Sequence, residues 1–187
     1  MNPTVAFPLN EAREIVAYWR EAGDKGNWFR KDPAFDRDFR NRFLRLHEAA
    51  GRRELDHWAD TADGSLALMI LLDQFPRNSF RGTARMYATD ELARWFAHDA
   101  LKKSHMQEVP ASLQLFFCLP FAHSEQLADQ DVSVELNTLL GTEARSHAEG
   151  HRDIIKRFGR FPHRNSILGR ASTPSEIEFL RNGGFAG

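Results

Sequence analysis

The sequence lacks several features that define large classes of protein. It has 187 residues but only one cysteine, Cys118, which leaves no internal disulfide and no multi-cysteine metal site. The 25 Lys and Arg residues nearly balance the 26 Asp and Glu residues, which argues against binding to nucleic acid or a membrane surface through bulk charge. No run approaches the roughly 20 apolar residues of a membrane helix, and residues 1–10 do not read as a signal peptide. These absences predict a cytoplasmic protein without nucleic-acid or membrane partners.

Strand patterns are missing as well. Alternating apolar and polar residues flanked by hairpin dipeptides do not occur, and the 12 glycines form no phosphate-binding or dinucleotide fingerprint. Apolar residues recur instead every three or four positions, as in Phe35, Phe39, Phe43 and Leu46. This spacing is typical of amphipathic helices. We therefore predict an all-α protein.

Capping signals predict where several helices begin and end. Asn10 is expected to cap the first helix, and Asp32 before a proline is expected to cap the second. Pro76 is expected to end the apolar helix before it. Thr173 and Glu176, on either side of a proline, form a capping box. Short turns between these helices predict stacked antiparallel helical hairpins.

No low-complexity linker divides the chain. We therefore expect one all-α domain over residues 1–187, with residues 183–187 as a frayed tail. The stacked hairpins suggest a tetratricopeptide-like superhelix, although no sequence repeat of about 34 residues is visible.

Two turns resemble each other in sequence. The first proline corner (residues 74–82) and the second proline corner (residues 160–169) share a Phe-Pro pair followed by Arg-Asn-Ser, with one residue inserted in the second. A repeated helix stop would explain the Phe, Pro, Asn and Ser residues. It would not explain the arginines, which are Arg77, Arg81, Arg160, Arg164 and, just beyond, Arg170.

The corner arginines have three possible roles. Guanidinium groups bind carboxylates and phosphates in pairs of hydrogen bonds, so the arginines could face a common anionic ligand. They could instead pair with internal carboxylates such as Asp73, Asp90 or Asp153 and hold helices in register. They could also lie on a solvated surface.

Histidines form a second group of candidates. His147 and His151 lie four residues apart on one face of a predicted helix and could share a metal ion, with a third ligand from His123, Glu125 or His163. Two ligands are too few for a metal site, and hydrogen-bonded interior histidines explain the same pattern. We predict no metal site, and the sequence identifies no cofactor.

The segment after Pro120 carries polar groups where a kink exposes them. Glu125 is a candidate general base, and His123 or His163 is a candidate acid. Ser124 is better explained as a helix cap than as a nucleophile, because no strand-turn-helix elbow surrounds it.

These motifs resemble a widespread bacterial family of uncharacterised proteins with a tetratricopeptide-like α-helical fold. The resemblance covers nearly the whole chain and implies the fold, but it supplies no established activity. His147 is outside the family pattern, which leaves His151 as the histidine of interest in that helix. The matching blocks are Trp19, Trp28-Phe29 and Phe35-Asp36; 71–78, 81–83 and Asp90; 119–121, 123–125 and Gln130; and 151–152, 157–165, 168–170 and Thr173.

Together these patterns predict an interior polar pocket that binds a small anionic molecule. Whether the protein is an enzyme stays open; the acid–base candidates are His123, Glu125, His151 and His163. The alternative is a tetratricopeptide-like module that binds a protein or peptide without catalysis. The predicted ligand-binding residues are Asp73, Gln74, Arg77, Asn78, Arg81, Arg160, Arg164 and Asn165.

Overall fold

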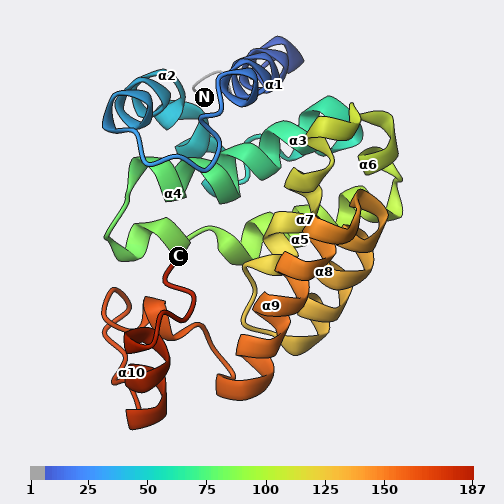
Figure 1. Cartoon of the computed structure of the whole chain (residues 1–187). Helices are drawn as coiled ribbons and strands as arrows, with labels where there is room; N and C mark the ends of the chain where they lie inside the picture. Colours follow the sequence, from blue (N-terminus) through green and yellow to red (C-terminus); the bar gives the residue numbers. More distant parts are fainter. Residues whose placement is uncertain (1–6) are drawn as a thin grey trace. The chain divides into compact units, whose positions relative to one another are not determined.

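A computed structural model describes residues 7–187, and this part of the chain is helical without a strand (Figure 1). The predicted all-α fold is therefore confirmed. The predicted absence of a signal peptide rests partly on residues 1–6, which lie outside the described residues. The elements are α1 (Leu9–Asp24), α2 (Pro33–Gly51), η1 (Asp56–Asp60), α3 (Ala62–Met69), η2 (Ile70–Gln74), α4 (Phe75–Ser79), η3 (Ala84–Tyr87), α5 (Asp90–Lys102), α6 (His105–Glu108), η4 (Ala111–Leu113), α7 (Leu115–Ala122), α8 (Leu127–Leu140), α9 (Thr142–Phe158), η5 (Pro162–Arg164) and α10 (Pro174–Arg181).

Contacts between residues divide the chain into two compact units. Unit 1 comprises Met1–Arg81 and Arg85–Pro120, and unit 2 comprises Gly82–Ala84 and Phe121–Gly187. Unit 1 therefore contains α1 to α6, and unit 2 contains α8 to α10. The prediction of one domain and that of a tetratricopeptide-like superhelix stay predictions.

The core of unit 1 is aromatic and surrounds α3. The residues from Leu66 to Leu72 are completely buried, as expected for a helix that is apolar on every side. Beside them, the buried Trp19 ring lies 5.2 Å from Phe39 and 5.4 Å from Phe116. Burial of each such side chain contributes about 1.5–3 kcal/mol, so unit 1 has a substantial core of its own.

The prediction that Pro76 ends its helix is wrong. The helix continues from α3 through η2, a π-helical turn in which the N–H of Phe75 bonds to the carbonyl of Ile70, and on into α4. Proline has no N–H to donate, and the Leu72 carbonyl accepts instead from the hydroxyl of Thr89 at 2.5 Å. The wider turn and this side-chain donor let the helix pass through the proline.

Helix caps follow the sequence in one case and depart from it in another. The Asp32 carboxylate accepts hydrogen bonds from the first turn of α2, which confirms that cap. Asn10 does not cap α1, because the helix already begins at Leu9 and the carbonyl of Pro8 accepts from Glu11. Asn10 thus lies two residues too late in the helix to act as its cap.

Unit 2 consists of a helical hairpin and a short C-terminal helix. Helices α8 and α9 lie side by side and are joined at Gly141, whose φ of 121° suits glycine (Figure 1). Beyond α9, Phe161 packs in a small core with Ile154 and Ile155. The predicted capping box at the start of α10 is also present.

Candidate functional site

Arg77, at the first proline corner, is bound by two carboxylates within unit 1. Its guanidinium donates two hydrogen bonds to Asp90, at 2.8 and 2.9 Å, and one to the Asp73 carbonyl at 2.7 Å. The Asp73 carboxylate lies 3.1 Å away. Burial favours the neutral form of Arg77, but the two aspartates outweigh it and hold the pKa of Arg77 above its usual value. Arg77 therefore couples the corner to α5.

The other polar residues of this corner form a second set of contacts. Arg81 donates to Asp36 on α2 at 2.6 and 3.2 Å, and Asn78 donates to the same carboxylate at 2.8 Å. Gln74 donates to Asp73 at 2.5 Å. The two arginines of the first corner thus have the internal pairing that the sequence left open as an alternative to ligand binding.

The π-helical turn explains how this corner is anchored. The carbonyl oxygens of Leu71 and Asp73 accept from side chains, as Leu72 does: His47 Nδ1 lies 2.9 Å from the Leu71 oxygen, and Arg77 donates to that of Asp73. Side-chain donors therefore serve three successive carbonyls around Pro76. No sequence pattern indicated this arrangement, because the three donors come from separate parts of the chain.

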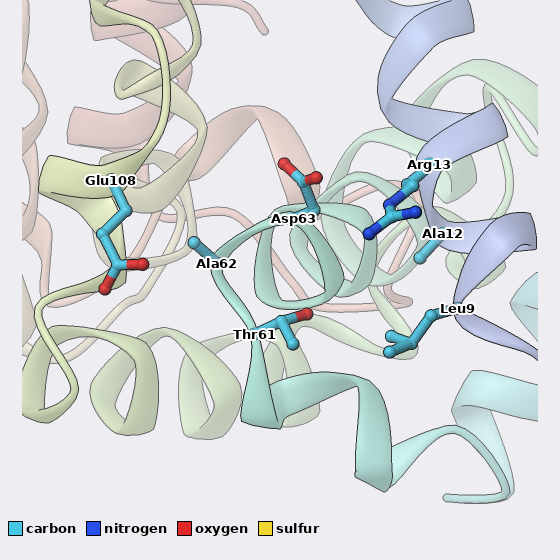
Figure 2. A pocket seen from close by; sticks show the side chains of 7 residues that line it. All are labelled: Leu9, Ala12, Arg13, Thr61, Ala62, Asp63 and Glu108. Carbon is cyan, nitrogen blue, oxygen red and sulfur yellow. The ribbon is translucent and has the colours of Figure 1, made fainter.

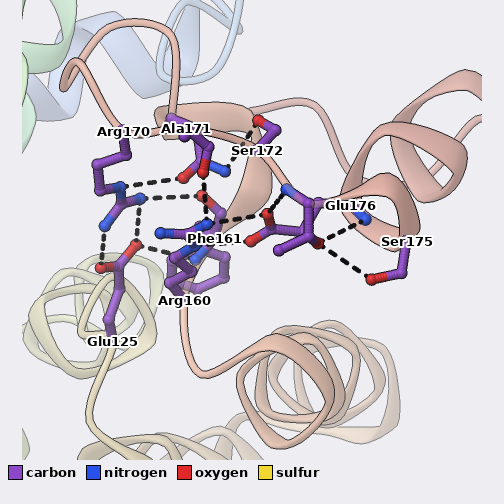
Figure 3. A network of polar contacts seen from close by, with 10 residues as sticks. Glu125, Arg160, Phe161, Arg170, Ala171, Ser172, Ser175 and Glu176 are labelled. Carbon is purple, nitrogen blue, oxygen red and sulfur yellow. Dashed lines mark hydrogen bonds and ion pairs between the residues drawn. The ribbon is translucent and has the colours of Figure 1, made fainter.

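At the second corner, in unit 2, Glu125 is fully engaged (Figure 3). Its carboxylate accepts from Arg170 at 2.7 and 3.0 Å and from the N–H of Phe161 at 2.8 Å. Burial raises the pKa of Glu125. The hydrogen bonds from Arg170 and from the Phe161 N–H lower it by more, so the pKa lies below its usual value. Glu125 is ionised, and it would have to leave Arg170 to act as a general base.

Arg160 also pairs with a carboxylate in unit 2. It donates to Glu176 at 2.6 and 2.9 Å and to the carbonyl of Ala171 at 2.8 Å (Figure 3). Hydrogen bonds from Arg160, and further ones from Thr173, lower the pKa of Glu176 to about 2. Glu176 therefore has two roles, because it caps α10 and also binds Arg160 of the second corner. Its capping-box position could be seen in the sequence, but its partner could not.

Asn165 completes this network. Its side-chain oxygen accepts from Arg170 at 3.0 Å, and its amide donates to Ser172 at 3.1 Å. Asn165 is 1% exposed. Its described contacts hold the loop between η5 and α10.

Three histidines gather around Arg164 of the second corner in unit 2. His123, His151 and His163 are half-buried, while Arg164 is buried. Burial lowers the pKa of His151 to about 4, assisted by the positive charges of His123, His147 and Arg164. The pKa of His163 is also lowered to about 4. Burial is the main cause, and the positive charges of Arg164 and His151 add to it. These side chains are close enough for their charges to act on one another, and we call His123, His151, His163 and Arg164 the histidine cluster.

Phe161 lies against the histidine cluster. Its ring centroid is 5.7 Å from that of His151 and 5.6 Å from that of His163, and the Arg164 guanidinium lies 4.6 Å above it. Arg164 also donates to the carbonyl of His123 at 2.9 Å. The aromatic residue of the second corner thus brings α9 and η5 together.

Two of the hollows in the described part of unit 1 contain no predicted site residue. A smaller one of about 160 Å³ lies beside Tyr18 and Arg42. No sequence motif indicated either of them. The larger, of about 260 Å³, is lined by Leu9, Ala12, Arg13, Thr61, Ala62, Asp63 and Glu108 (Figure 2).

The described part of the chain contains neither a group of metal ligands nor a helix suited to a membrane. Among residues 7–187, no three His, Cys, Asp or Glu side chains are grouped to hold a metal ion. Over the same residues, no helix combines the length and apolar character needed to cross a membrane.

Known proteins resemble the chain over most of its length. A solved structure of a protein of unknown function from Agrobacterium tumefaciens is 55% identical to it, covers 93% of this chain and 98% of its own, and has a TM-score of 0.90. No curated protein matches significantly. The model of a family described as "Bacterial protein of unknown function (DUF924)" matches residues 15–184. The chain therefore belongs to this bacterial family.

Proposed function

We propose that the histidine cluster binds a small anion and performs acid–base chemistry on it. The observation that supports this most is the concentration of positive and protonatable groups: three half-buried imidazoles beside one buried guanidinium. Burial and the neighbouring positive charges both disfavour protonation of His151 and His163. A bound anion would oppose both effects, so the cluster is suited to such a ligand.

The carboxylates of the second corner are engaged by other groups. Glu125 accepts from Arg170 and from a backbone N–H, and Glu176 accepts from Arg160 and Thr173. Glu125 raises the pKa of His163, but the net shift of His163 remains downward. This favours an external anion over Glu125 or Glu176 as the counterion of the imidazoles.

The shifted histidines suggest a chemical role. With a pKa of about 4, His151 and His163 are neutral at neutral pH and available to accept a proton. An anion within hydrogen-bonding distance raises the pKa of an imidazole, which brings it toward the range where general acids and bases work best. Ligand binding should therefore be accompanied by proton uptake.

Calorimetry tests the proposal with inorganic phosphate and acetate as probes at pH 6. We expect binding with proton uptake, seen as a binding enthalpy that depends on the ionisation enthalpy of the buffer. Arg164→Gln should weaken binding at least about tenfold, since a charged hydrogen bond is worth about 1.5–3 kcal/mol. Arg145→Gln is the matched control, because it removes an exposed arginine from the same unit.

Because Arg164 is buried, His163→Gln provides a second variant at a half-buried position. It should abolish most of the proton uptake while the thermal unfolding curve stays cooperative. Absence of binding by both probes, or equal binding by Arg164→Gln and Arg145→Gln, would refute the proposed site. In that case the alternative, a protein or peptide partner, is tested by native mass spectrometry of the protein with bacterial lysate fractions.

A further inference from the structure

The segment after α10 follows a path that two glycines determine. Gly183 has a φ of 81°, and its N–H bonds to the carbonyl of Leu180. Gly184 donates to the carbonyl of Phe179, and a Cβ added at Gly184 would lie 2.6 Å from that oxygen. Only glycine adopts the first conformation easily, and only glycine fits at the second position. The two residues turn the chain back toward η5 and α9.

This turn places Phe185 on the histidine cluster. The Phe185 ring lies edge-on to His151, with centroids 4.6 Å apart at 87°, and to His163, with centroids 5.1 Å apart at 82°. Phe161 lies 6.4 Å away. Three rings, one from α9 and two from the second corner, thus contact one aromatic side chain, and the two imidazoles do so in the edge-to-face geometry that such rings favour. We call His151, His163 and Phe161 the ring seat.

Few other contacts hold Phe185 in place. Its side chain is 42% exposed. Among the described residues, 185–187 have no hydrogen bond to another part of the chain. Gly187 lies close to the His163 imidazole, where an added Cβ would be 3.1 Å from the ring. The segment is therefore attached mainly by ring contacts, which a competing aromatic group could replace.

The charged groups near the ring seat favour an anion over a cation. His147 and His151 project from α9, His163 and Arg164 from η5, and His123 from the loop before α8. Glu125 is the acidic group that acts on His163, and Arg170 engages it. A ligand ring in the seat would thus lie among groups of positive or protonatable character.

We propose that Phe185 occupies the position of a ligand's aromatic ring, so that the anion bound by unit 2 is an aromatic carboxylate or an aryl phosphate. This inference rests on the proposed function, and it adds the class of ligand. His151 and His163 serve both parts of such a ligand, because the imidazoles that would bind the anion also contact the ring of Phe185. The ligand displaces the segment of residues 185–187 when it binds.

Binding of phenyl phosphate and of inorganic phosphate to the wild type and to Phe185→Ala tests the inference. Removing the internal ring should strengthen phenyl phosphate binding about tenfold, which corresponds to the upper range of one aromatic pair. Inorganic phosphate needs no ring seat, so its affinity should change less than about twofold. Ile177→Ala, which shortens an exposed apolar side chain on α10, should leave both affinities unchanged.

NMR of the wild type gives a second measurement that does not depend on a variant. Phenyl phosphate should shift the ring resonances of Phe185 toward those of an exposed phenylalanine, and inorganic phosphate should not. If inorganic phosphate binds but Phe185→Ala gains nothing for phenyl phosphate, the ring seat is refuted and the anion site stands. If neither probe binds to either protein, the anion site is refuted and the ring seat with it.

Discussion

The two proline corners have similar sequences but different surroundings. At the first corner, Arg77 and Arg81 meet aspartates on the neighbouring helices α5 and α2. At the second corner, Arg160 and Arg170 meet glutamates, but Arg164 lies beside imidazoles and on the ring of Phe161. A shared motif therefore specifies a helix end with guanidinium groups, and the partners from other elements decide what those groups do.

Removing the ion pairs of Arg77 at the first corner should have the largest effect on the free energy of unfolding. Arg77→Ala would leave the almost completely buried carboxylate of Asp73 without its arginine, and loss of one member of a buried ion pair typically costs about 3–5 kcal/mol. Urea unfolding should show that loss. Arg52→Ala removes an exposed pair with Glu54 and should change stability by less than about 1 kcal/mol. Equal effects of the two substitutions would contradict a structural role for the first corner.

Lowering the pH should reduce the stability of the protein through the histidines at and beside the second corner. The pKa values of His151 and His163 fall from 6.5 to about 4 on folding. The unfolded chain thus binds protons more readily, and stability should be lost as the pH falls from about 6.5 toward 4. In the double variant His151→Gln, His163→Gln, urea midpoints should depend less on pH in this range. An unchanged pH dependence would show that the histidines titrate normally.

Removing the hydroxyl that serves Leu72 should have a moderate effect on the first corner. Thr89→Val keeps the shape of the side chain but leaves the buried carbonyl without this donor, a loss of about 1–3 kcal/mol. Thermal unfolding measures the change. Thr138→Val is a matched control, because the hydroxyl of Thr138 bonds within its own helix to a carbonyl, and a smaller loss is expected there.

The smallest effect is expected from Glu176 at the second corner. Its pKa is lowered from 4.5 to about 2, so its contribution is present above about pH 4.5 and is lost as the pH falls toward 2. Glu176→Gln should reduce the steepness of acid unfolding in that range and leave the pH dependence of stability between about pH 4.5 and 6.5 unchanged. A change confined to the higher range would contradict the assignment.

The fold class and several helix ends were predictable because they depend on local signals. Asp32 and Thr173 act as caps through atoms two or three residues away, so sequence spacing suffices. The prediction at Pro76 is wrong because a donor just before α5, Thr89, lets the helix continue. Asn10 was misassigned because nothing in its neighbourhood excludes a start at Leu9.

The candidate site was less predictable because its contacts are distant along the chain. Glu125 has the residue type of a general base, but its engagement with Arg170 spans 45 positions. Asp36 and Glu176, which bind corner arginines, carry no signal of that pairing in the sequence. Phe185 belongs to a segment that composition alone assigns to a frayed tail, and its contacts with His151 depend on a turn at two glycines.

The π-helical turn at Ile70–Gln74 has a consequence for chain-length variation. Each i to i+5 hydrogen bond encloses one residue more than an α-helical bond, so deleting one residue here would restore a regular helix. The five residues of the π-helical turn rotate the chain about as far as four residues of an α-helix, so Arg77 would stay on the side that faces Asp90. A relative that is one residue shorter between α3 and Pro76 should therefore retain the first corner, with a regular α-helix in place of the π-helical turn.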